Sequence, residues 1–285
     1  MKQMKWLAGV AFLSFLASCG NVKKETASTE ACVLPLGVTV QNIDQLELTT
    51  LKDNEGDKRM PNKLFYGLRD SARVELLSPE GSVASSIHCF LVETEGKKVL
   101  FDTGNGAENG GCLLMRLDSL GLSPADIDYL VLTHFHNDHI GGMLQGDTAV
   151  FTRAEVYVPE TEYDHWVTKG DTTAFAARAM RAYAGRLHRF AANDTLPLGI
   201  LSLPAPGHTP GHTVYRMGRL LIAGDLMHGL ELQLQDLNLC PLFDMDRAEA
   251  VASRKKYIEY VRQSNDSLIV AGMHFPDNGI WNKSE

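Results

Sequence analysis

Cysteine is scarce in this sequence, with five residues in 285, and no two of them have the CxxC spacing of a zinc or redox motif. The apolar run near the N-terminus, LAGVAFLSFLA, has eleven residues, whereas a transmembrane helix needs ~20. Basic clusters are also short: the longest run is RKK at residues 254–256, which we expect on the solvated face of a helix. Because phosphate neutralisation needs clustered Lys and Arg, the net charge of −8 argues against nucleic acid as a partner.

The composition is that of an ordinary globular protein, with 44% hydrophobic and 22% charged residues. A chain of 285 residues can bury a substantial core. Residues 35–285 contain no fixed-period repeat and no internal linker. Stretches typical of strands and of helices alternate along them, so we predict a single α/β domain over residues 35–285.

The N-terminal segment has the features of an export signal. A positively charged start precedes the apolar run, and residues 16–19 (LASC) resemble the bacterial lipobox, in which the cysteine is acylated. We predict a signal peptide over residues 1–18, a lipid anchor on Cys19 and a flexible tether over residues 19–34. The alternative is plain secretory cleavage with a chance cysteine. The protein is therefore expected in the periplasm or on the cell surface, attached to the membrane.

Export would place the remaining cysteines in an oxidising compartment, where disulfides can form. Four cysteines remain after Cys19: Cys32, Cys89, Cys112 and Cys240. The sequence does not distinguish among their three possible pairings. We expect Cys89 and Cys240 to be buried free thiols, because both lie in apolar surroundings.

Apolar stretches followed by tight turns predict most of the strands. Residues 86–93 and 98–101 are expected to pair as a hairpin, and further strands are expected at residues 129–133, 154–158, 200–203, 220–223 and 267–271. Capping and helical spacing predict a short helix from residue 123 and helices over residues 172–190 and 246–263. The last is the clearest amphipathic helix, and its inward residues are Ala250, Tyr257, Ile258 and Val261.

Residues 133–142, THFHNDHIGG, hold three of the ten histidines and an aspartate at the end of a predicted strand. Side chains two apart on an extended segment point the same way, so His134 and His136 can reach one ion. His208, Asp225 and His274 also lie in turns that follow predicted strands. Imidazole and carboxylate ligands without thiolate suit zinc, manganese, iron or cobalt, and zinc is the usual metal for hydrolysis. The pattern therefore predicts a metal site.

The spaced pattern HxHxDH…H…D…H resembles the metallo-β-lactamase superfamily, and the likeness covers most of residues 83–280, including VLFDTGNG, PGHTPGH, AGD and AGMHFP. The resemblance implies an αββα sandwich with metals at the edge between two β-sheets. It assigns one divalent ion to His134, His136 and His208, a second ion to Asp138, His139 and His274, and a bridging position to Asp225. Two such ions lower the pKa of a shared water, and the resulting bridging hydroxide would attack a small-molecule ester, lactone or phosphoester.

Within the superfamily, the sequence looks most like the branch of N-acyl-homoserine lactonases and methyl parathion hydrolase, through GDLMHGLELQLQD and the segments after it. The lactonases place a tyrosine three residues after the bridging aspartate, where this chain has His228. Either lactones are not the substrate, or His228 takes over the tyrosine's contact with the substrate oxygen. A glyoxalase II-like thioesterase and a lipid-anchored metal-binding protein without turnover are the alternative functions.

Asp138 and His228 are the candidate catalytic residues. His228 could donate a proton to the leaving group, or it could instead fix Asp225 in place. His212 is expected to orient its loop rather than to bind metal. Asp102 is expected to contact a metal-bound imidazole or to stabilise its own turn.

Several neighbouring residues have predicted places around the site or in the core. Four aromatic side chains are expected to line a pocket for an apolar substrate: Phe135, Tyr163, Trp166 and Phe243. Three methionines are expected in the core: Met143, Met227 and Met245. Residues 244–247 are expected to cap the helix that follows them. Loops around residues 60–80, 160–185 and 228–243 are expected to select the leaving group.

Overall fold

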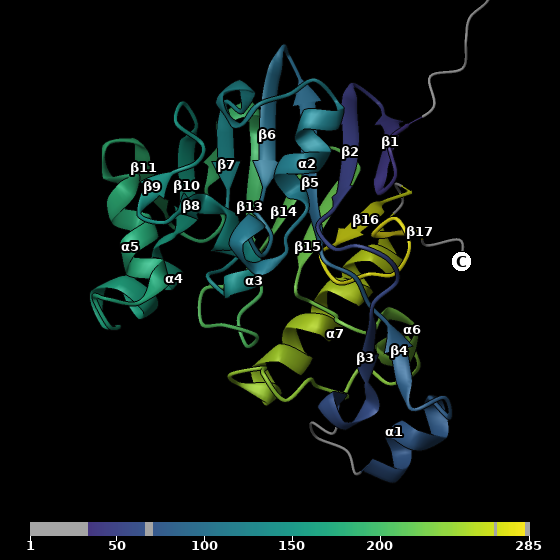
Figure 1. Cartoon of the computed structure of the whole chain (residues 1–285). Helices are drawn as coiled ribbons and strands as arrows, with labels where there is room; N and C mark the ends of the chain where they lie inside the picture. The colour runs from purple at the N-terminus through teal and green to yellow at the C-terminus, as the bar shows by residue number, and fades with distance from the viewer. Residues whose placement is uncertain (1–33, 66–70, 265–266, 283–285) are drawn as a thin grey trace, which may run out of the picture. The chain divides into compact units, whose positions relative to one another are not determined.

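The computed structural model describes residues 34–65, 71–264 and 267–282, which contain two β-sheets with helices against their outer faces (Figure 1). The predicted signal peptide, Cys19 and Cys32 lie outside the described residues. Within the described part, no helix combines the length and the apolar character needed to cross a membrane.

The first sheet has seven strands in the order β1-β2-β5-β6-β7-β10-β11. They are β1 (Val38–Ile43), β2 (Leu46–Lys52), β5 (His88–Thr94), β6 (Lys97–Phe101), β7 (Tyr129–Val131), β10 (Glu155–Pro159) and β11 (Leu187–Phe190). The strands from β1 to β6 pair antiparallel, whereas the pairs from β6 to β11 are parallel. The predicted hairpin of residues 86–93 and 98–101 is confirmed as the β5–β6 pair.

The second sheet has six strands in the order β12-β13-β14-β15-β16-β17. They are β12 (Thr195–Leu196), β13 (Ile200–Pro204), β14 (Thr213–Met217), β15 (Leu220–Gly224), β16 (Ile269–Gly272) and β17 (Ile280–Asn282). Only the β15–β16 pair of this sheet is parallel. Two small hairpins lie outside the sheets, β3 (Arg59–Pro61) with β4 (Ser82–Ala84) and β8 (Leu144–Gln145) with β9 (Thr148–Ala149).

Most of the described α-helices are short. They are α1 (Ser71–Leu77), α2 (Leu113–Ser119), α3 (Asn137–Ile140), α4 (Glu160–Tyr163), α5 (Phe175–Ala182), α6 (Leu230–Gln235) and α7 (Arg247–Gln263). Single turns of 3-10 helix add Asn62–Phe65, Ala107–Asn109, Pro124–Asp126, Gly141–Met143, Ala184–Arg186 and Pro197–Gly199, and Asp164–Thr168 forms a π turn. The helix predicted from residue 123 is thus one 3-10 turn, in which the carboxylate of Asp126 accepts hydrogen bonds from Ser123.

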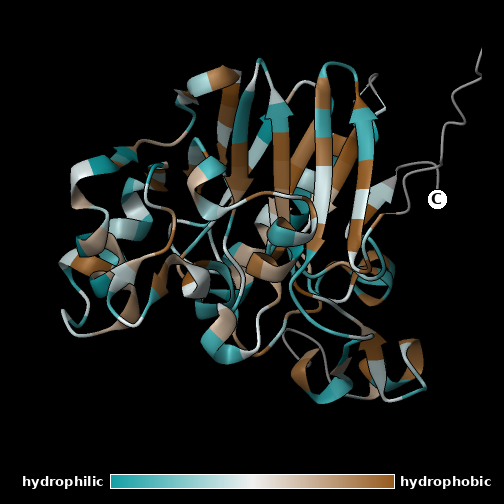
Figure 2. Cartoon of the chain, turned by 45° about the horizontal axis from the view of Figure 1, so that its top comes forward, coloured by the Kyte–Doolittle hydropathy of each residue, from teal (hydrophilic) through white to brown (hydrophobic). Residues whose placement is uncertain are grey.

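Alternation of side chains along the strands produces the layers of the core. In β5, Phe90 and Val92 pack between the two sheets, whereas Leu91 packs with residues of α2, α3 and α5. In β15, Ile222 packs between the sheets and Leu221 packs against α7. Figure 2 shows apolar residues along the strands of both sheets. The layers run helix, sheet, sheet, helix, and the predicted αββα sandwich is confirmed.

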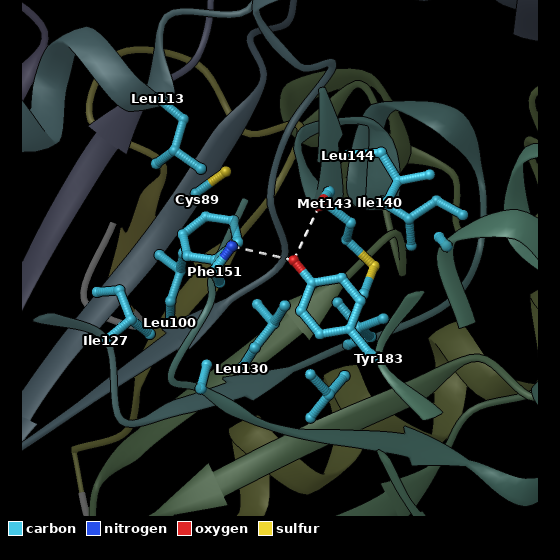
Figure 3. Close-up of a cluster of buried hydrophobic side chains, with 14 of the residues drawn as sticks. Cys89, Leu100, Leu113, Ile127, Leu130, Ile140, Met143, Leu144, Phe151 and Tyr183 are labelled. Carbon is cyan, nitrogen blue, oxygen red and sulfur yellow. Dashed lines mark hydrogen bonds between the residues drawn. The ribbon is translucent and has the colours of Figure 1, made fainter. Parts of the chain in front are cut away.

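The two longer predicted helices fare differently. Residues 246–263 form α7, where the carboxylate of Asp246 accepts a hydrogen bond from the backbone N–H of Glu249 at 2.9 Å and all four predicted inward residues are buried. The helix predicted over residues 172–190 is wrong in its second half, because α5 ends at Ala182 and residues 187–190 form β11 along β10. Buried Tyr183 follows α5 directly and is held in place by its hydroxyl, which donates to the carbonyl of Met143 and accepts from the Phe151 N–H (Figure 3).

The sulfur-containing residues lie mostly in the core. Cys89, Cys112 and Cys240 are buried and free of disulfides in the described part of the chain, which confirms the expectation for Cys89 and Cys240. Met143 and Met227 are also buried, as predicted. The prediction for Met245 is wrong: the side chain is 48% exposed, because it lies in the loop that leads into α7.

Candidate metal centre

The predicted ligands lie in loops at the ends of strands in both sheets. His134 and His136 follow β7, and Asp138 and His139 lie in the short helix α3 directly after them. The others come from the second sheet: His208 from the β13–β14 loop, Asp225 from the end of β15 and His274 from the end of β16. Because β15 and β16 are parallel neighbours, their carboxyl ends meet at one edge of the sheet.

All seven predicted ligands come together in two groups. His134, His136, His208 and Asp225 offer donor atoms within 4.8 Å of one another, and so do Asp138, His139 and His274. In the first group, His136 Nδ1 lies 2.8 Å from His208 Nε2. In the second, His274 Nε2 lies 3.4 Å from a carboxylate oxygen of Asp138. These two groups correspond to the ligand sets that the resemblance implies, but His228 also forms groups, one with His208 and Asp244 and one with Asp225 and His274.

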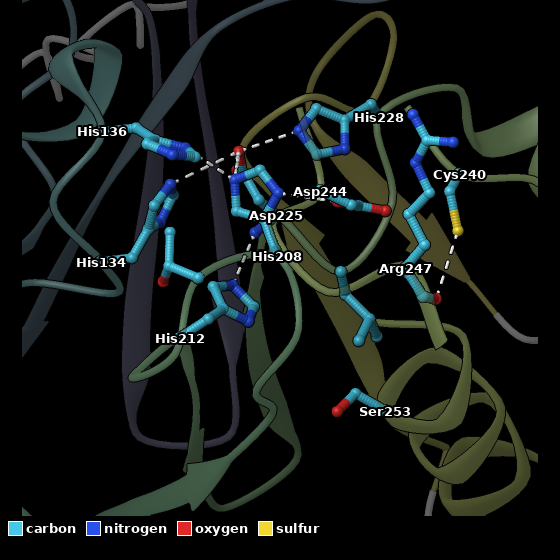
Figure 4. A network of polar contacts seen from close by, with 12 residues as sticks. His134, His136, His208, His212, Asp225, His228, Cys240, Asp244, Arg247 and Ser253 are labelled. Carbon is cyan, nitrogen blue, oxygen red and sulfur yellow. Dashed lines mark hydrogen bonds and ion pairs between the residues drawn. The ribbon is translucent and has the colours of Figure 1, made fainter. Parts of the chain in front are cut away.

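The carboxylate of Asp225 lies close to donors of both groups, and Figure 4 shows it beside His134, His136 and His208 of the first. Its Oδ2 is 3.2 Å from His208 Nε2 and 3.1 Å from His274 Nε2, and its Oδ1 is 3.1 Å from His139 Nε2. Donors that share one zinc ion at 2.0–2.1 Å are expected about 3 to 3.5 Å apart. The carboxylate of Asp225 therefore has the spacing of a ligand that could contact two ions.

Unpartnered buried atoms at the centre of the cluster fit divalent metal ions. His134 Nε2, His139 Nε2 and Asp225 Oδ1 are buried and make no hydrogen bond. Leaving such atoms without a hydrogen bond is costly in a protein interior, and an ion in each donor group would satisfy all three. The donor set contains nitrogen and oxygen but no sulfur, which agrees with zinc, manganese, iron or cobalt.

The whole arrangement can be compared with known proteins. Residues 83–272 match the family model described as the metallo-beta-lactamase superfamily. The matched range begins before the first predicted ligand and includes six of the seven, with His274 two residues beyond its end.

The chain belongs to the metallo-beta-lactamase superfamily.

Individual relatives support the same family. The uncharacterized protein YobT of Bacillus subtilis is 28% identical over 149 residues, which cover 49% of this chain and 61% of YobT. An N-acyl homoserine lactonase of Bacillus thuringiensis is 24% identical over 214 residues, which cover 66% of this chain and 81% of the lactonase. The solved structure of AidC, a dizinc quorum-quenching lactonase in complex with the product N-hexnoyl-L-homoserine, matches with a TM-score of 0.75 and 27% identity, over 86% of this chain and 92% of AidC.

In this superfamily member, a carboxylate orients one imidazole of each group. Asp102 Oδ2 lies 2.7 Å from His139 Nδ1 and also accepts the hydroxyl of Thr133 at 2.7 Å. Asp102 has a positive φ of 60°, so it both shapes its turn and contacts a predicted ligand, as expected. Carboxylates of this kind fix the tautomer and the orientation of a metal-binding imidazole.

Asp244 orients an imidazole of the other group in the same way. The prediction that Asp244 caps the following helix is therefore wrong. Asp244 Oδ1 lies 2.9 Å from His208 Nδ1, whereas the helix cap is made by Asp246 alone.

Behind Asp244 lies Arg254, whose guanidinium is 3.4 Å from Asp244 Oδ2. Arg254 is 1% exposed and donates to the carbonyls of residues 226, 237 and 239, so the expectation that it lies on a solvated helix face is also wrong.

Burial and mutual repulsion disfavour protonation of several imidazoles. Burial, together with His208, lowers the pKa of His136 to about 3. Burial also opposes protonation of His208 itself, but hydrogen bonds to Asp225 and Asp244 raise its pKa to about 9. Burial would raise the pKa of Asp225, yet the surrounding imidazoles, His139 foremost, hold it well below the usual range. The anionic form of Asp225, which a cation requires, is therefore the stable one.

His212 holds the backbone of Asp225. Its Nδ1 donates to the carbonyl of Ala205 at 2.9 Å, and its Nε2 accepts the N–H of Asp225 at 2.9 Å. Gly224, which directly precedes Asp225, has a φ of 54°, and a Cβ on it would lie 2.4 Å from His212 Nε2. A glycine is therefore required at this position, and His212 joins the β13–β14 loop to the end of β15.

Glu162, in α4, is an organising residue that sequence reasoning missed. The side chain is fully buried and accepts hydrogen bonds from the Phe135 N–H at 3.0 Å and from the Gly211 N–H at 2.8 Å. It also accepts the Thr209 hydroxyl at 2.9 Å and the Trp166 indole N–H at 2.6 Å. One carboxylate thus joins the loop of His134 and His136 to the loop of His208. A glutamate after a predicted strand carries no local pattern that would have revealed this.

His228 is buried and contacts the central carboxylate. Its Nε2 lies 3.0 Å from Asp225 Oδ2, and its ring stacks on His274 with centroids 4.7 Å apart. Burial lowers the pKa of His228 to about 4, against the effect of Asp225, so the imidazole is neutral at pH 7. Of the two predicted roles, the contact favours fixing Asp225 over proton donation.

A pocket of about 470 Å³ opens over the cluster. Its lining residues are Lys58, Arg59, Met60, Pro61, Leu64, Ser85, Ser86, Ile87, His136, Asn137, Asp138, His208, Asp225, His228, Phe243 and His274. Of the four aromatics predicted to line a pocket, only Phe243 does so. Phe135 instead packs in the core between the first sheet and its helices, and the partly buried Tyr163 and Trp166 pack against that core. The side chains over the site come from the β3–β4 hairpin and its neighbours, not from residues 160–185.

Proposed function

We propose that the protein is a hydrolase that binds two divalent metal ions, zinc in the first instance, and cleaves an ester, lactone or phosphoester. The observation that carries the proposal is the position of Asp225, whose carboxylate lies 3.1 Å from His139 in one donor group and 3.2 Å from His208 in the other. Membership of the metallo-beta-lactamase superfamily supports it. Residues 35–285 would form the hydrolase domain.

When bound, the two ions would activate a water and polarise the oxygen of the bond under attack. Residues of the chain would orient the ligands and contact the substrate. Asp102 and Asp244 hold His139 and His208 in the orientation that presents Nε2 to the centre. Asp138 and His228 both line the pocket; Asp138 stays a candidate catalytic residue, whereas His228 would act by holding Asp225 in place. Hydrolysis adds water across that bond and releases an acid and an alcohol.

The pocket supports a small-molecule substrate. Its volume of about 470 Å³ lies within the ~300–1,000 Å³ of ordinary small-molecule sites. AidC and the Bacillus thuringiensis protein are lactonases, which favours a lactone or ester bond over others. A glyoxalase II-like thioesterase remains the second candidate within the same chemistry.

Turnover of a substrate panel tests the proposal. Purified protein should hydrolyse at least one of a lactone, an aryl ester, a thioester and a phosphotriester. Complete removal of metal by a chelator should abolish that activity, and zinc should restore it. Turnover that survives complete metal removal would contradict the mechanism, and a metal-loaded protein inactive on the whole panel would favour metal binding without turnover.

We also propose that residues 1–18 are an export signal, that Cys19 carries a lipid and that residues 19–34 tether the domain to a membrane outside the cytoplasm. The LASC motif after an apolar run supports this. Cells fed a labelled fatty acid should label the protein, and Cys19→Ser should abolish the label. A label that persists in the variant would contradict the anchor at Cys19.

A further inference from the structure

The charged residues that line the pocket are unevenly distributed. The chain has 35 acidic and 27 basic residues, yet the two bases Lys58 and Arg59 line the pocket alongside only two acids. Both acids, Asp138 and Asp225, belong to the proposed metal ligands. With their charge committed to cations, the pocket has no acidic side chain left among the described residues to balance the two bases.

Arg59 is already neutralised. Its guanidinium lies 2.9 Å from a carboxylate oxygen of Glu80 and donates to both the hydroxyl and the carbonyl of Ser82. These contacts belong to the β3–β4 hairpin, where Arg59 pairs with Ala84. The guanidinium fork is therefore occupied by the protein itself and is not the group that would receive a substrate.

Lys58 differs from Arg59 in that no hydrogen bond or ion pair holds its exposed ammonium among the described residues, although its charge lowers the pKa of Asp53 against the effect of burial. Its backbone is fixed, since its carbonyl accepts the N–H of Ser85 at 3.0 Å. The buried carboxylate of Asp53 accepts the N–H groups of Asn105 and Leu113 at 2.7 and 2.8 Å instead. Lys58 thus presents to the pocket an ammonium that no hydrogen bond or ion pair with a described residue occupies.

Part of the remaining wall is apolar, although two serines, Asn137 and four histidines also line it. Its apolar residues are Met60, Pro61, Leu64, Ile87 and Phe243. Lys58 itself is exposed, so solvent and salt screen its attraction for an anion. A single ammonium acts as a point charge and can bind a compact anion such as a carboxylate without the bidentate geometry that arginine provides.

We propose that the substrate carries a carboxylate apart from its scissile bond and that Lys58 binds it. This inference rests on the proposed hydrolase function and narrows it to esters, or lactones, of carboxylate-bearing molecules. The scissile group lies over the ligand cluster, the carboxylate lies at Lys58, and the apolar wall contacts the carbon chain between them.

Binding of two hydrolysis products tests the inference without requiring turnover. Succinate and butyrate have the same chain length, and only succinate has a second carboxylate. Calorimetry on the metal-loaded protein should give a dissociation constant for succinate about fivefold lower than that for butyrate, and raised salt should reduce the ratio. Lys58→Met should remove the preference while leaving butyrate binding unchanged. Lys63→Met is the matched control, because Lys63 is exposed, near in sequence and outside the pocket lining.

Equal binding of succinate and butyrate to the wild type would overturn the inference. A preference that persists in Lys58→Met would also overturn it, since the second carboxylate would then be bound elsewhere. Turnover measurements distinguish a failure of the proposed role of Lys58 from a failure of the proposed hydrolase function. If neutral aryl butyrates and anionic aryl hemisuccinates are cleaved equally well, the hydrolase proposal stands and the role of Lys58 falls. If neither ester is cleaved but succinate binding depends on Lys58, the inference that Lys58 binds a carboxylate is supported and the proposed activity on esters is contradicted.

Discussion

Asp102 and Asp244, whose carboxylates each orient an imidazole, differ in the groups that contact them from the opposite side. Asp102 is backed by the neutral hydroxyl of Thr133, whereas Asp244 is backed by the cationic guanidinium of Arg254. The negative charge of Asp244 is therefore partly compensated by a cation, whereas Asp102 is stabilised only by neutral hydrogen bonds from Thr133 and interacts more strongly with His139. We expect the two donor groups to bind metal with different affinities for this reason.

The substitution Asp244→Asn isolates the contribution of this carboxylate. An asparagine keeps the shape, but its amide lacks the negative charge that holds His208 and pairs with Arg254. The affinity for one of the two metal ions should fall about 10- to 100-fold, the loss typical of removing such an outer partner. Titration of metal-free protein with zinc, in competition with a chromogenic chelator, measures this.

Asp246→Asn is the control for that experiment. Asp246 caps α7 through the Glu249 N–H and touches no proposed ligand. Because asparagine caps a helix about as well as aspartate does, the variant should leave zinc affinity unchanged. If Asp244→Asn binds both ions as tightly as wild type does, the contact with His208 has no part in holding the metal.

At the scale of elements, the sequence predicted the strands that lead into the site better than the rest of the fold. The strands β7, β15 and β16 were expected because each is a short apolar run that ends in a turn, a local signal. The β3–β4 hairpin, which supplies much of the pocket wall, was not expected. Each of its strands has only three residues, too few for an alternating pattern to be recognised in the sequence.

Contacts between distant segments explain the other failures. Residues 187–190 were expected to be helical, but pairing with β10 at the sheet edge outweighs a weak helical preference. Asp244 and Arg254 were assigned to a cap and to a solvated face, because nothing local shows that they meet over His208. The ligand set came from a family resemblance with fixed order and spacing, which local propensity does not supply.

At the scale of the molecule, the sandwich brings the loops of both sheets to one edge. The first sheet supplies His134, His136 and the helix α3, and the second supplies His208, Asp225 and His274. Glu162 and His212 then join these loops through buried hydrogen bonds, so the cluster is held from several elements at once. Such preorganisation suits the two-ion site that we propose.

Metal content measured by elemental analysis tests the central claim, two ions joined by Asp225, most directly. Wild-type protein saturated with zinc and then desalted should contain two ions per chain. Asp225→Ala should lose metal and activity together, because it removes the one carboxylate that reaches both donor groups. His228→Ala should keep both ions, since His228 contacts Asp225 without belonging to the proposed ligand set. One ion or fewer in the wild type, or two ions retained in Asp225→Ala, would contradict the account.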